Sequence, residues 1–247
     1  MNNPQKKLYE KIHDEYSKHY YDYWSSQYRK IFVYNQLFNN FNFSEKKIVE
    51  LACGEGHATN YLIKKFKNTR ITGIDISEKA INAYTKKNKA DGHVLDITKE
   101  FYLKEKFDFA LILGGLHLCT NDIAQTLKNI SNLLKPNGVL FIHEPNSYFF
   151  LESVRKIWHK KDKYFANNYI EALNHKEISK LNKNFQCTFL KYVGGPAYLL
   201  ICNSLILRIP LFVKNIISPL LIIPEFFWSL LPGYFQITFM ARWKKIK

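Results

Sequence analysis

Residues 49–59 read VELACGEGHAT, and this stretch decides the fold that we expect. Its first residues lie in the apolar run 47–53. This run is short and nearly continuous, as in a strand buried on both faces. Residues 58–66 then have the pattern of a helix. The small residues between them allow a ligand to lie against the backbone, and the helix offers free N–H donors to an anionic group. The stretch therefore predicts a cofactor site between a buried strand and a helix.

The segments that follow continue the alternation of strand and helix. Ser77 is a good N-cap residue for a helix, and the sequence Lys-Pro-Asn-Gly at 135–138 is a stop signal for another. Strands are expected at 70–76, 93–95, 107–113 and 139–143, and helices at 78–88 and 122–134. Such alternation requires parallel crossovers, so we expect a doubly wound, Rossmann-like α/β sheet with helices on both faces.

Acidic residues stand at the ends of the second and third expected strands. Asp75 is placed to accept the hydroxyl hydrogens of a ribose, and Asp96 to accept the exocyclic amine of an adenine. The dinucleotide fingerprint G-x-G-x-x-G requires a glycine at position 59, where this chain has Thr59. A nucleotide-like cofactor is therefore favoured, and a nicotinamide oxidoreductase is disfavoured.

These features together resemble the class I methyltransferase family. Its first motif is similar to residues 50–56, its ribose and adenine acids are similar to Asp75 and Asp96, and its LKPGG stretch is similar to residues 133–140. The resemblance covers residues 46–146 and implies a seven-stranded, mostly parallel sheet whose last strand is antiparallel. It also implies that S-adenosylmethionine lies across the strand ends. The chain departs from the pattern at Ala52, where the first glycine is usual, and at His57, where glycine is frequent.

The resemblance and the strand ends together define the residues expected to contact the cofactor. They lie in the first turn and at the ends of the second, third and fourth strands. They are Glu50, Ala52, Gly54, Gly56, His57, Thr59, Asp75, Ile76, Asp96, Ile97 and Leu113. No cluster of His, Asp and Glu stands out in the sequence, so no metal is expected.

Methyl transfer needs alignment, exclusion of water and often a base. His117 follows the fourth strand, and His143 and Glu144 follow the fifth, where ligands bind in such sheets. An imidazole titrates near neutral pH and is suited to take a proton from a hydroxyl or an ammonium group. We therefore name these three residues as catalytic candidates, with His143 preferred because Glu144 is adjacent. His19, Tyr20 and Tyr21 are candidates for a lid.

Two regions lie outside the expected sheet. Residues 1–45 are aromatic-rich and predict an N-terminal helical cap, in which Tyr16, Tyr20, Tyr23 and Trp24 share one helix face. Residues 46–247 form the methyltransferase domain, with an apolar helical insertion at about 197–232 acting as a lid. Prolines and charges divide the apolar run at 198–240 into pieces too short to span a membrane, so broken amphipathic helices with peripheral membrane contact at most are expected. Residues 234–243 predict a last strand.

The composition of the chain says little about which class of molecule it binds. The net charge of +15 favours anionic partners, but the lysines are scattered, as on a solvated surface. The motif Asn/Asp-Pro-Pro-aromatic, usual in methyltransferases of base amines, is absent after the fourth strand, so nucleic acid is not expected as substrate. The four cysteines are far apart and form no CxxC pair, which together with the polar N-terminus favours the cytoplasm.

Three hypotheses about function follow. The first is methyl transfer from S-adenosylmethionine to an oxygen or nitrogen of a small molecule, such as a surface-glycan or secondary-metabolite precursor. The second, suggested by the apolar C-terminal third, is methylation of a lipid-linked or quinone acceptor at a membrane surface. The third, from another class, is a protein that binds the cofactor without catalysis. The oligomeric state is left open.

Overall fold

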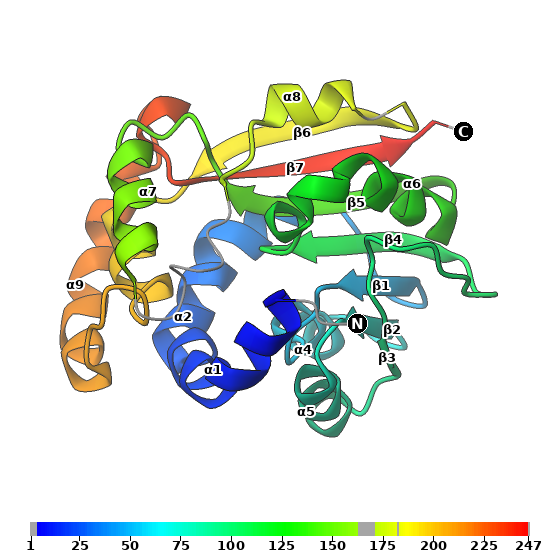
Figure 1. Cartoon of the computed structure of the whole chain (residues 1–247), viewed down its shortest axis with the longest axis horizontal. Coiled ribbons are helices and arrows are strands. Elements are labelled where there is room, and N and C mark those ends of the chain that lie inside the picture. Colours follow the sequence, from blue (N-terminus) through cyan, green and yellow to red (C-terminus); the bar gives the residue numbers. More distant parts are fainter. Residues whose placement is uncertain (1–3, 163–170, 182, 247) are drawn as a thin grey trace.

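The computed structural model describes residues 4–162, 171–181 and 183–246. Seven strands form one sheet in the order β3-β2-β1-β4-β5-β7-β6 (Figure 1). The first five strands pair in parallel, and β7 runs antiparallel to both β5 and β6. The expected Rossmann-like, mostly parallel seven-stranded sheet is confirmed. Its strands are β1 (Lys47–Leu51), β2 (Arg70–Asp75), β3 (Gly92–Val94), β4 (Phe107–Leu113), β5 (Leu134–Pro145), β6 (Phe185–Val193) and β7 (Thr238–Lys245).

Helices cover both faces of this sheet. In the N-terminal half they are α1 (Pro4–Tyr20), α2 (Tyr23–Tyr28), the π-helix η1 (Arg29–Tyr34), α3 (Asn35–Leu37), α4 (His57–Lys65) and α5 (Glu78–Asn88). Further along they are η2 (Leu116–Asp122), α6 (Ile123–Leu133), α7 (Glu152–Lys161), α8 (His175–Lys180), the π-helix η4 (Tyr198–Cys202), α9 (Leu211–Trp228) and η5 (Gly233–Phe235).

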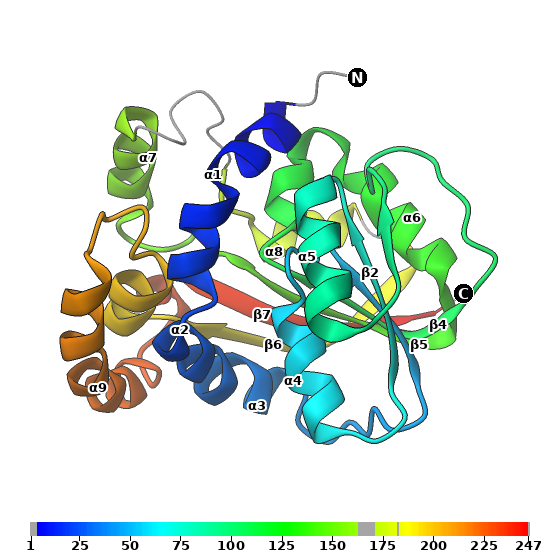
Figure 2. The ribbon, with the colours of Figure 1, turned by 90° about the horizontal axis from the view of Figure 1, so that it is seen from below.

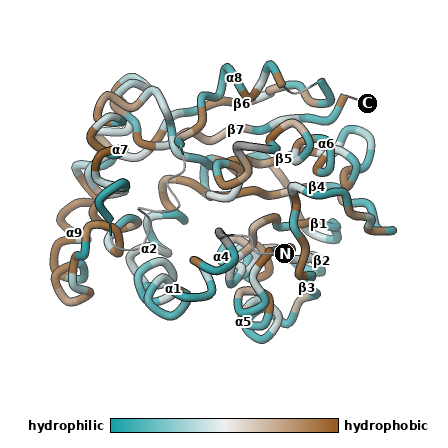
Figure 3. The backbone as a smooth tube through the Cα atoms, in the orientation of Figure 1, coloured by the Kyte–Doolittle hydropathy of each residue, from teal (hydrophilic) through white to brown (hydrophobic). Residues whose placement is uncertain are grey.

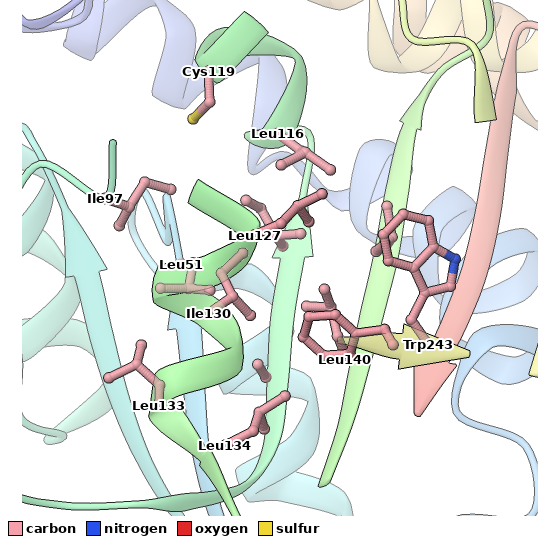
Figure 4. Close-up of a cluster of buried hydrophobic side chains, with 14 of the residues drawn as sticks. Leu51, Ile97, Leu116, Cys119, Leu127, Ile130, Leu133, Leu134, Leu140 and Trp243 are labelled. Atoms are coloured by element: carbon pink, nitrogen blue, oxygen red, sulfur yellow. The ribbon is translucent and has the colours of Figure 1, made fainter. Parts of the chain in front are cut away.

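Alternate residues of the central strands enter two separate hydrophobic clusters. Val49 and Leu51 of β1 belong to the cluster that includes α6, whereas Ile48 belongs to the cluster that includes α3 and α4. Figure 4 shows Leu127, Ile130 and Leu133 of α6 facing the sheet in the first cluster. Because successive side chains of a strand point to opposite faces, continuous apolar runs are required in strands covered on both sides.

The N-terminal aromatic residues belong to two helices, so the prediction of one shared helix face is wrong. The helix α1 ends at Tyr20, and α2 begins at Tyr23. Asp22 caps α2, because its Oδ1 accepts hydrogen bonds from the backbone N–H of Trp24 at 2.9 Å and of Ser25 at 3.1 Å. The rings of Tyr16 and Tyr20 stack on α1 with centroids 4.7 Å apart.

The insertion between β6 and β7 also differs from the expectation of short, broken helices. The helix α9 is continuous over 18 residues, although Pro219 and Pro224 lie inside it. By length and apolar composition it is the one helix of the described chain that could span a membrane. Its two charged residues, Lys214 and Glu225, are buried, one near each end. Both make hydrogen bonds to other elements.

Lys214 connects α9 to the N-terminal helices. Its Nζ donates to the backbone oxygen of His19 at 2.8 Å, to Ser25 Oγ at 2.7 Å and to the carboxylate of Asp22. Glu225 accepts hydrogen bonds from Tyr28 Oη at 2.5 Å and from the backbone N–H groups of Gly195 and Ala197 at 2.7 and 2.9 Å. The N-terminal helices and the insertion are therefore joined through buried charged groups.

We predict that Lys214→Ala lowers the free energy of unfolding by about 1–3 kcal/mol, because the half-buried Asp22 carboxylate loses a charged hydrogen-bond donor. Urea titration followed by circular dichroism measures the change. Lys86→Ala, which removes an exposed lysine of α5, is the control and should shift the midpoint little. Equal midpoints for the two variants would contradict a stabilising role for this ion pair.

Candidate active site

A cavity of about 160 Å³ lies at the carboxyl ends of β1, β2 and β4. Tyrosines of α1 and the α1–α2 connection, including Tyr16, Tyr20 and Tyr21, close it from the side away from the sheet. Figure 2 shows α1 and α2 running alongside the strand ends. Most of the predicted cofactor residues line this cavity, namely Glu50, Ala52, Gly54, His57, Asp75, Ile76, Asp96, Ile97 and Leu113. The topology therefore brings together residues that are far apart in the sequence.

The turn after β1 has an unusual backbone. Ala52, Gly54 and Gly56 have φ values of 49°, 53° and 77°. A Cβ atom at Gly54 would lie 2.4 Å from the Tyr21 hydroxyl, so a larger residue does not fit under α1. The N–H of Gly54 donates to Asp75 Oδ2 at 2.9 Å, and the N–H of Glu55 donates to the Tyr21 hydroxyl at 2.9 Å. The turn is thus fixed to both β2 and the α1–α2 connection.

Both predicted acids face the cavity. Asp75 also accepts a hydrogen bond from the N–H of Ser77 at 2.9 Å, and burial raises its pKa. Oδ1 of Asp96 accepts from the N–H and hydroxyl of Thr98 at 3.0 and 2.6 Å. Each carboxylate oxygen has two lone pairs, so these internal bonds leave capacity for ligand hydroxyl and amine donors.

Three residues of the first motif have structural partners. Oε2 of Glu50 accepts from the N–H of Thr59 at 3.1 Å and from its hydroxyl at 2.5 Å, and burial raises the pKa of Glu50 to about 7. Thr59 is fully buried and also contacts the Tyr84 hydroxyl at 3.0 Å, so it supports Glu50 from behind the cavity wall. Gly56 packs against Tyr84 and Asn88. The geometry gives Thr59 and Gly56 supporting positions instead of the expected cofactor contact.

His57 connects the turn to the N-terminal helices. Its Nδ1 lies 2.9 Å from Tyr34 Oη, and its Nε2 lies 2.8 Å from Ser26 Oγ. Burial lowers its pKa to about 2, so the ring stays neutral at physiological pH. A histidine in place of the frequent glycine therefore holds η1 and α2 against the cavity.

Arg29 is a cavity residue that the sequence analysis missed. Its guanidinium carbon lies 3.5 Å from the centre of the Tyr20 ring, and its Nη1 donates to the backbone oxygen of Tyr20 at 2.6 Å. Its Nη2 is buried and has no hydrogen-bond partner among the described residues. A buried arginine with a spare donor in a cavity wall is suited to bind a carboxylate. The sequence offered no signal, since an arginine in a polar helical segment usually lies on the surface.

A second cavity of about 270 Å³ adjoins the first. Tyr20, Gly114, Leu118 and His143 line both. The remaining walls of the second cavity are mainly apolar and come from α7, from residues 198–207 and from the start of β7. No residue of α9 lines it in the part of the chain that the structure describes, so residues 198–207 supply the wall that was expected from the whole insertion.

Glu144 contacts His117, and the preference for His143 because of its neighbour is therefore wrong. Oε2 of Glu144 lies 2.7 Å from Nδ1 of His117, while Oε1 accepts from the N–H groups of Gly115 and Leu116 at 2.9 and 2.7 Å. Glu144 is almost completely buried, which suits it to position His117. With Nδ1–H donated to Glu144, Nε2 of His117 is left as a proton acceptor.

His143 has a different environment. The Thr238 hydroxyl donates to the backbone oxygen of Val193 at 2.7 Å, so the Nε2–H of His143 donates to Thr238 Oγ1 at 3.0 Å. Burial lowers the pKa of His143 to about 3, which makes it a weak base. Its place between the two cavities suits it to contact the reacting groups without accepting a proton.

Comparison with known proteins agrees with this geometry. Residues 49–140 match a family model described as a methyltransferase domain. For residues 49–140, this match agrees with the resemblance to the class I methyltransferase family. It is 32% identical over 139 residues to malonyl-[acyl-carrier protein] O-methyltransferase of Priestia megaterium, which covers 54% of this chain and 50% of that protein.

Two further proteins show the range of this methyltransferase family. The ubiquinone biosynthesis O-methyltransferase of Histophilus somni is 30% identical over 116 residues, covering 43% of this chain and 48% of that protein. The chain thus spans about half the length of the relatives it matches. The N-methyltransferase NodS of Bradyrhizobium japonicum, solved with S-adenosylhomocysteine, superposes with a TM-score of 0.61 at 14% identity, covering 97% of this chain and 99% of that one. At that identity the superposition shows the fold.

The residues of the first cavity fit S-adenosylmethionine, the methyl donor of class I methyltransferases. Gly54 lines the cavity with its backbone, and Asp75 and Asp96 offer acceptors suited to a ribose and an adenine. The spare donor of Arg29 matches its carboxylate. No cluster of three or more His, Cys, Asp or Glu residues suited to a metal occurs among the described residues.

We predict that Asp75→Ala weakens binding of S-adenosylhomocysteine by about 1–3 kcal/mol, the scale of a charged group's lost hydrogen bonds. Binding of 5′-methylthioadenosine should weaken equally, since both ligands carry the ribose. Calorimetric titration measures both affinities, and Asp91→Ala, which changes an exposed side chain, is the control. Unchanged affinity in Asp75→Ala would remove Asp75 from the cofactor site.

Proposed function

We propose that the protein transfers a methyl group from S-adenosylmethionine to an oxygen or nitrogen of a small-molecule acceptor with an apolar body. The observation that carries this proposal is the shared wall of the two cavities. The first cavity has the polar groups that the cofactor needs, and the second is mainly apolar and contains the His117–Glu144 pair. Bound S-adenosylmethionine supplies a methyl group already activated by its sulfonium.

The residues of the chain then supply binding, alignment and proton transfer. Asp75, Asp96 and Arg29 hold the cofactor, and the tyrosines of α1 exclude water from the site. His117 takes the proton of the acceptor's hydroxyl or ammonium group at Nε2. The Glu144 carboxylate holds the ring in the required tautomer and stabilises the imidazolium that forms.

The apolar walls of the second cavity also support a quinone or lipid-linked acceptor as the second candidate. Val154, Trp158, Leu199 and Ile206 are among the side chains that line it. Of the two relatives, one is named for ubiquinone biosynthesis, which agrees with a quinone acceptor, whereas the other is named for a malonyl group on a carrier protein. A glycan precursor fits these walls less well. A protein that only binds the cofactor would not need the His117–Glu144 pair.

A screen of acceptors tests the proposal. Purified protein is incubated with S-adenosylmethionine and with phenols, quinols, amines or carboxylic acids, and acceptor-dependent S-adenosylhomocysteine is measured. Turnover with an apolar member of one class is expected. Tight cofactor binding without turnover in any of these classes would favour the hypothesis that the protein binds the cofactor without catalysis.

We predict that His117→Ala lowers turnover by about 10²–10⁴-fold, the usual contribution of a general base. His143→Ala should lose less, because its pKa of about 3 makes it a poor proton acceptor. The rates of both variants are compared over a pH range with the acceptor found in the screen. Cofactor affinity, measured in parallel, should stay near that of the parent. A larger loss in His143→Ala than in His117→Ala would reverse the assignment.

We predict that Arg29→Met weakens binding of S-adenosylhomocysteine by roughly 10- to 100-fold, since a charge-assisted hydrogen bond is lost. Binding of 5′-methylthioadenosine, which has no carboxylate, should change little, and this comparison separates ligand contact from damage to the fold. Arg29→Lys keeps the charge and should recover part of the affinity. Equal losses for both ligands would show that Arg29 acts only through packing on Tyr20.

A further inference from the structure

The polarity of α9 is reversed relative to a surface helix of a water-soluble protein. Its charged residues Lys214 and Glu225 point inward and are buried, together with Ser218. Its outward face carries large apolar side chains at helical spacing, each between 65% and 71% exposed. They are Phe212, Ile216, Leu220, Ile223 and Phe227. Figure 3 shows α9 as a largely hydrophobic segment at one end of the molecule. An apolar face of this extent indicates an environment other than water.

The helix α7 continues this surface. Leu151, just before the helix, and Val154, Ile157 and Trp158 within it are exposed, and its last turn is basic, with His159, Lys160 and Lys161. Figures 1 and 2 both place α7 and α9 at the end of the molecule opposite the C-terminus. The Nε1 of Trp158 donates to the backbone oxygen of Ile206 at 3.4 Å, in the segment that leads to α9. We call the exposed apolar side chains of residues 151–158 and of α9 the apolar end face.

The second cavity reaches this surface. Leu151, Val154 and Trp158 line the cavity and are at the same time exposed on the apolar end face. Leu199, which lies outside the end face, also lines the cavity and is partly exposed. An apolar molecule that enters between these side chains therefore passes from the end face into the cavity that contains His117.

We propose that the apolar end face docks on the surface of an anionic lipid bilayer, with α7 and α9 lying in its interface. The basic last turn of α7 and the net charge of +15 complement an anionic surface. A helix with Trp and apolar residues on one side and Lys or Arg on another is typical of such interfaces. The acceptor would then enter the second cavity from the bilayer, and this part of the proposal rests on the proposed function.

Two other occupants of the face are disfavoured by the same structure. In a bilayer-spanning position, α9 would lose the bonds of Lys214 and Glu225 to the helix α2, its Asp22 cap and the β6–η4 connection. A second copy of the chain would bring two strongly cationic molecules together, which like-charge repulsion opposes. Both alternatives have distinct outcomes in the experiment below.

Sedimentation with vesicles tests the docking. The whole protein should bind vesicles of equal parts phosphatidylcholine and phosphatidylglycerol, bind phosphatidylcholine alone at least about tenfold more weakly, and be released by alkaline carbonate. Ile216→Glu combined with Leu220→Glu should lower binding to the anionic vesicles at least about tenfold. Tyr102→Glu combined with Leu181→Glu is the control, since these exposed apolar residues lie outside the end face.

The electrostatic part has its own matched pair of variants. Lys160→Glu with Lys161→Glu should weaken binding to anionic vesicles about tenfold, whereas Lys86→Glu with Lys104→Glu, equal in net charge, should change it less. Calorimetric binding of S-adenosylhomocysteine, measured without vesicles, checks that each variant is folded and tests the cofactor site separately. Failure of the proposed methyl transfer would leave the vesicle result unchanged.

Three outcomes would overturn the docking proposal. The first is equal vesicle binding by the end-face variant and its control, or no binding by the parent protein. The second is membrane association that resists alkaline carbonate, which indicates a spanning helix. The third is a dimer in solution that Ile216→Glu with Leu220→Glu dissociates, without vesicle binding by the parent, which assigns the face to a second copy of the chain.

Discussion

Two successive backbone donors of the turn between β1 and α4, the N–H groups of Gly54 and Glu55, bond to other elements, and the arrangement of the site depends on these two contacts. The turn contains three residues with positive φ, Ala52, Gly54 and Gly56, and the N–H of Gly56 bonds within it to the oxygen of Cys53. The Asp75 carboxylate of β2 accepts a hydrogen bond from the N–H of Gly54. The hydroxyl of Tyr21, which lies just beyond the end of α1, accepts one from the N–H of Glu55. In the helix α4, which follows the turn, the N–H of Thr59 donates a hydrogen bond to the Glu50 carboxylate of β1. The strand that carries Asp75 and the connection that carries Tyr21 are therefore both held by one short segment of backbone.

The fold was predictable from the sequence where local pattern and long-range packing agree. The parallel strands β1, β2 and β4 are apolar runs with helices between them, and each begins at the expected residue and ends within two residues of the expected end. The edge strand β6 was not located, because Gln186, Thr188 and Lys191 interrupt its apolar residues and leave no continuous run like that of a central strand. The continuity of α9 was also missed, since proline predicts a break, and the buried anchors of Lys214 and Glu225 have no local signature.

The candidate site was predictable as a set of residues but not as a set of contacts. Acids at strand ends meet in one cavity because parallel strands end at the same edge of the sheet. Glu144 and His143 are neighbours in the sequence, but successive side chains of a strand leave on opposite sides, so the carboxylate holds His117 instead. Arg29 had no sequence signal at all, since its role depends on Tyr20 and on its burial under the N-terminal helices.

The buried pairs between α9 and the N-terminal helices have a consequence for how such a protein can change in evolution. Lys214 matches Asp22, and Glu225 matches Tyr28, across nearly the whole length of the sequence. A recombinant that took the first 45 residues from one parent and the insertion from another would inherit a buried charge without its counterpart. The two regions are therefore expected to be exchanged together, as one module, while the sheet between them stays the same. New acceptor specificity would then require one crossover after the N-terminal region and one on each side of the insertion.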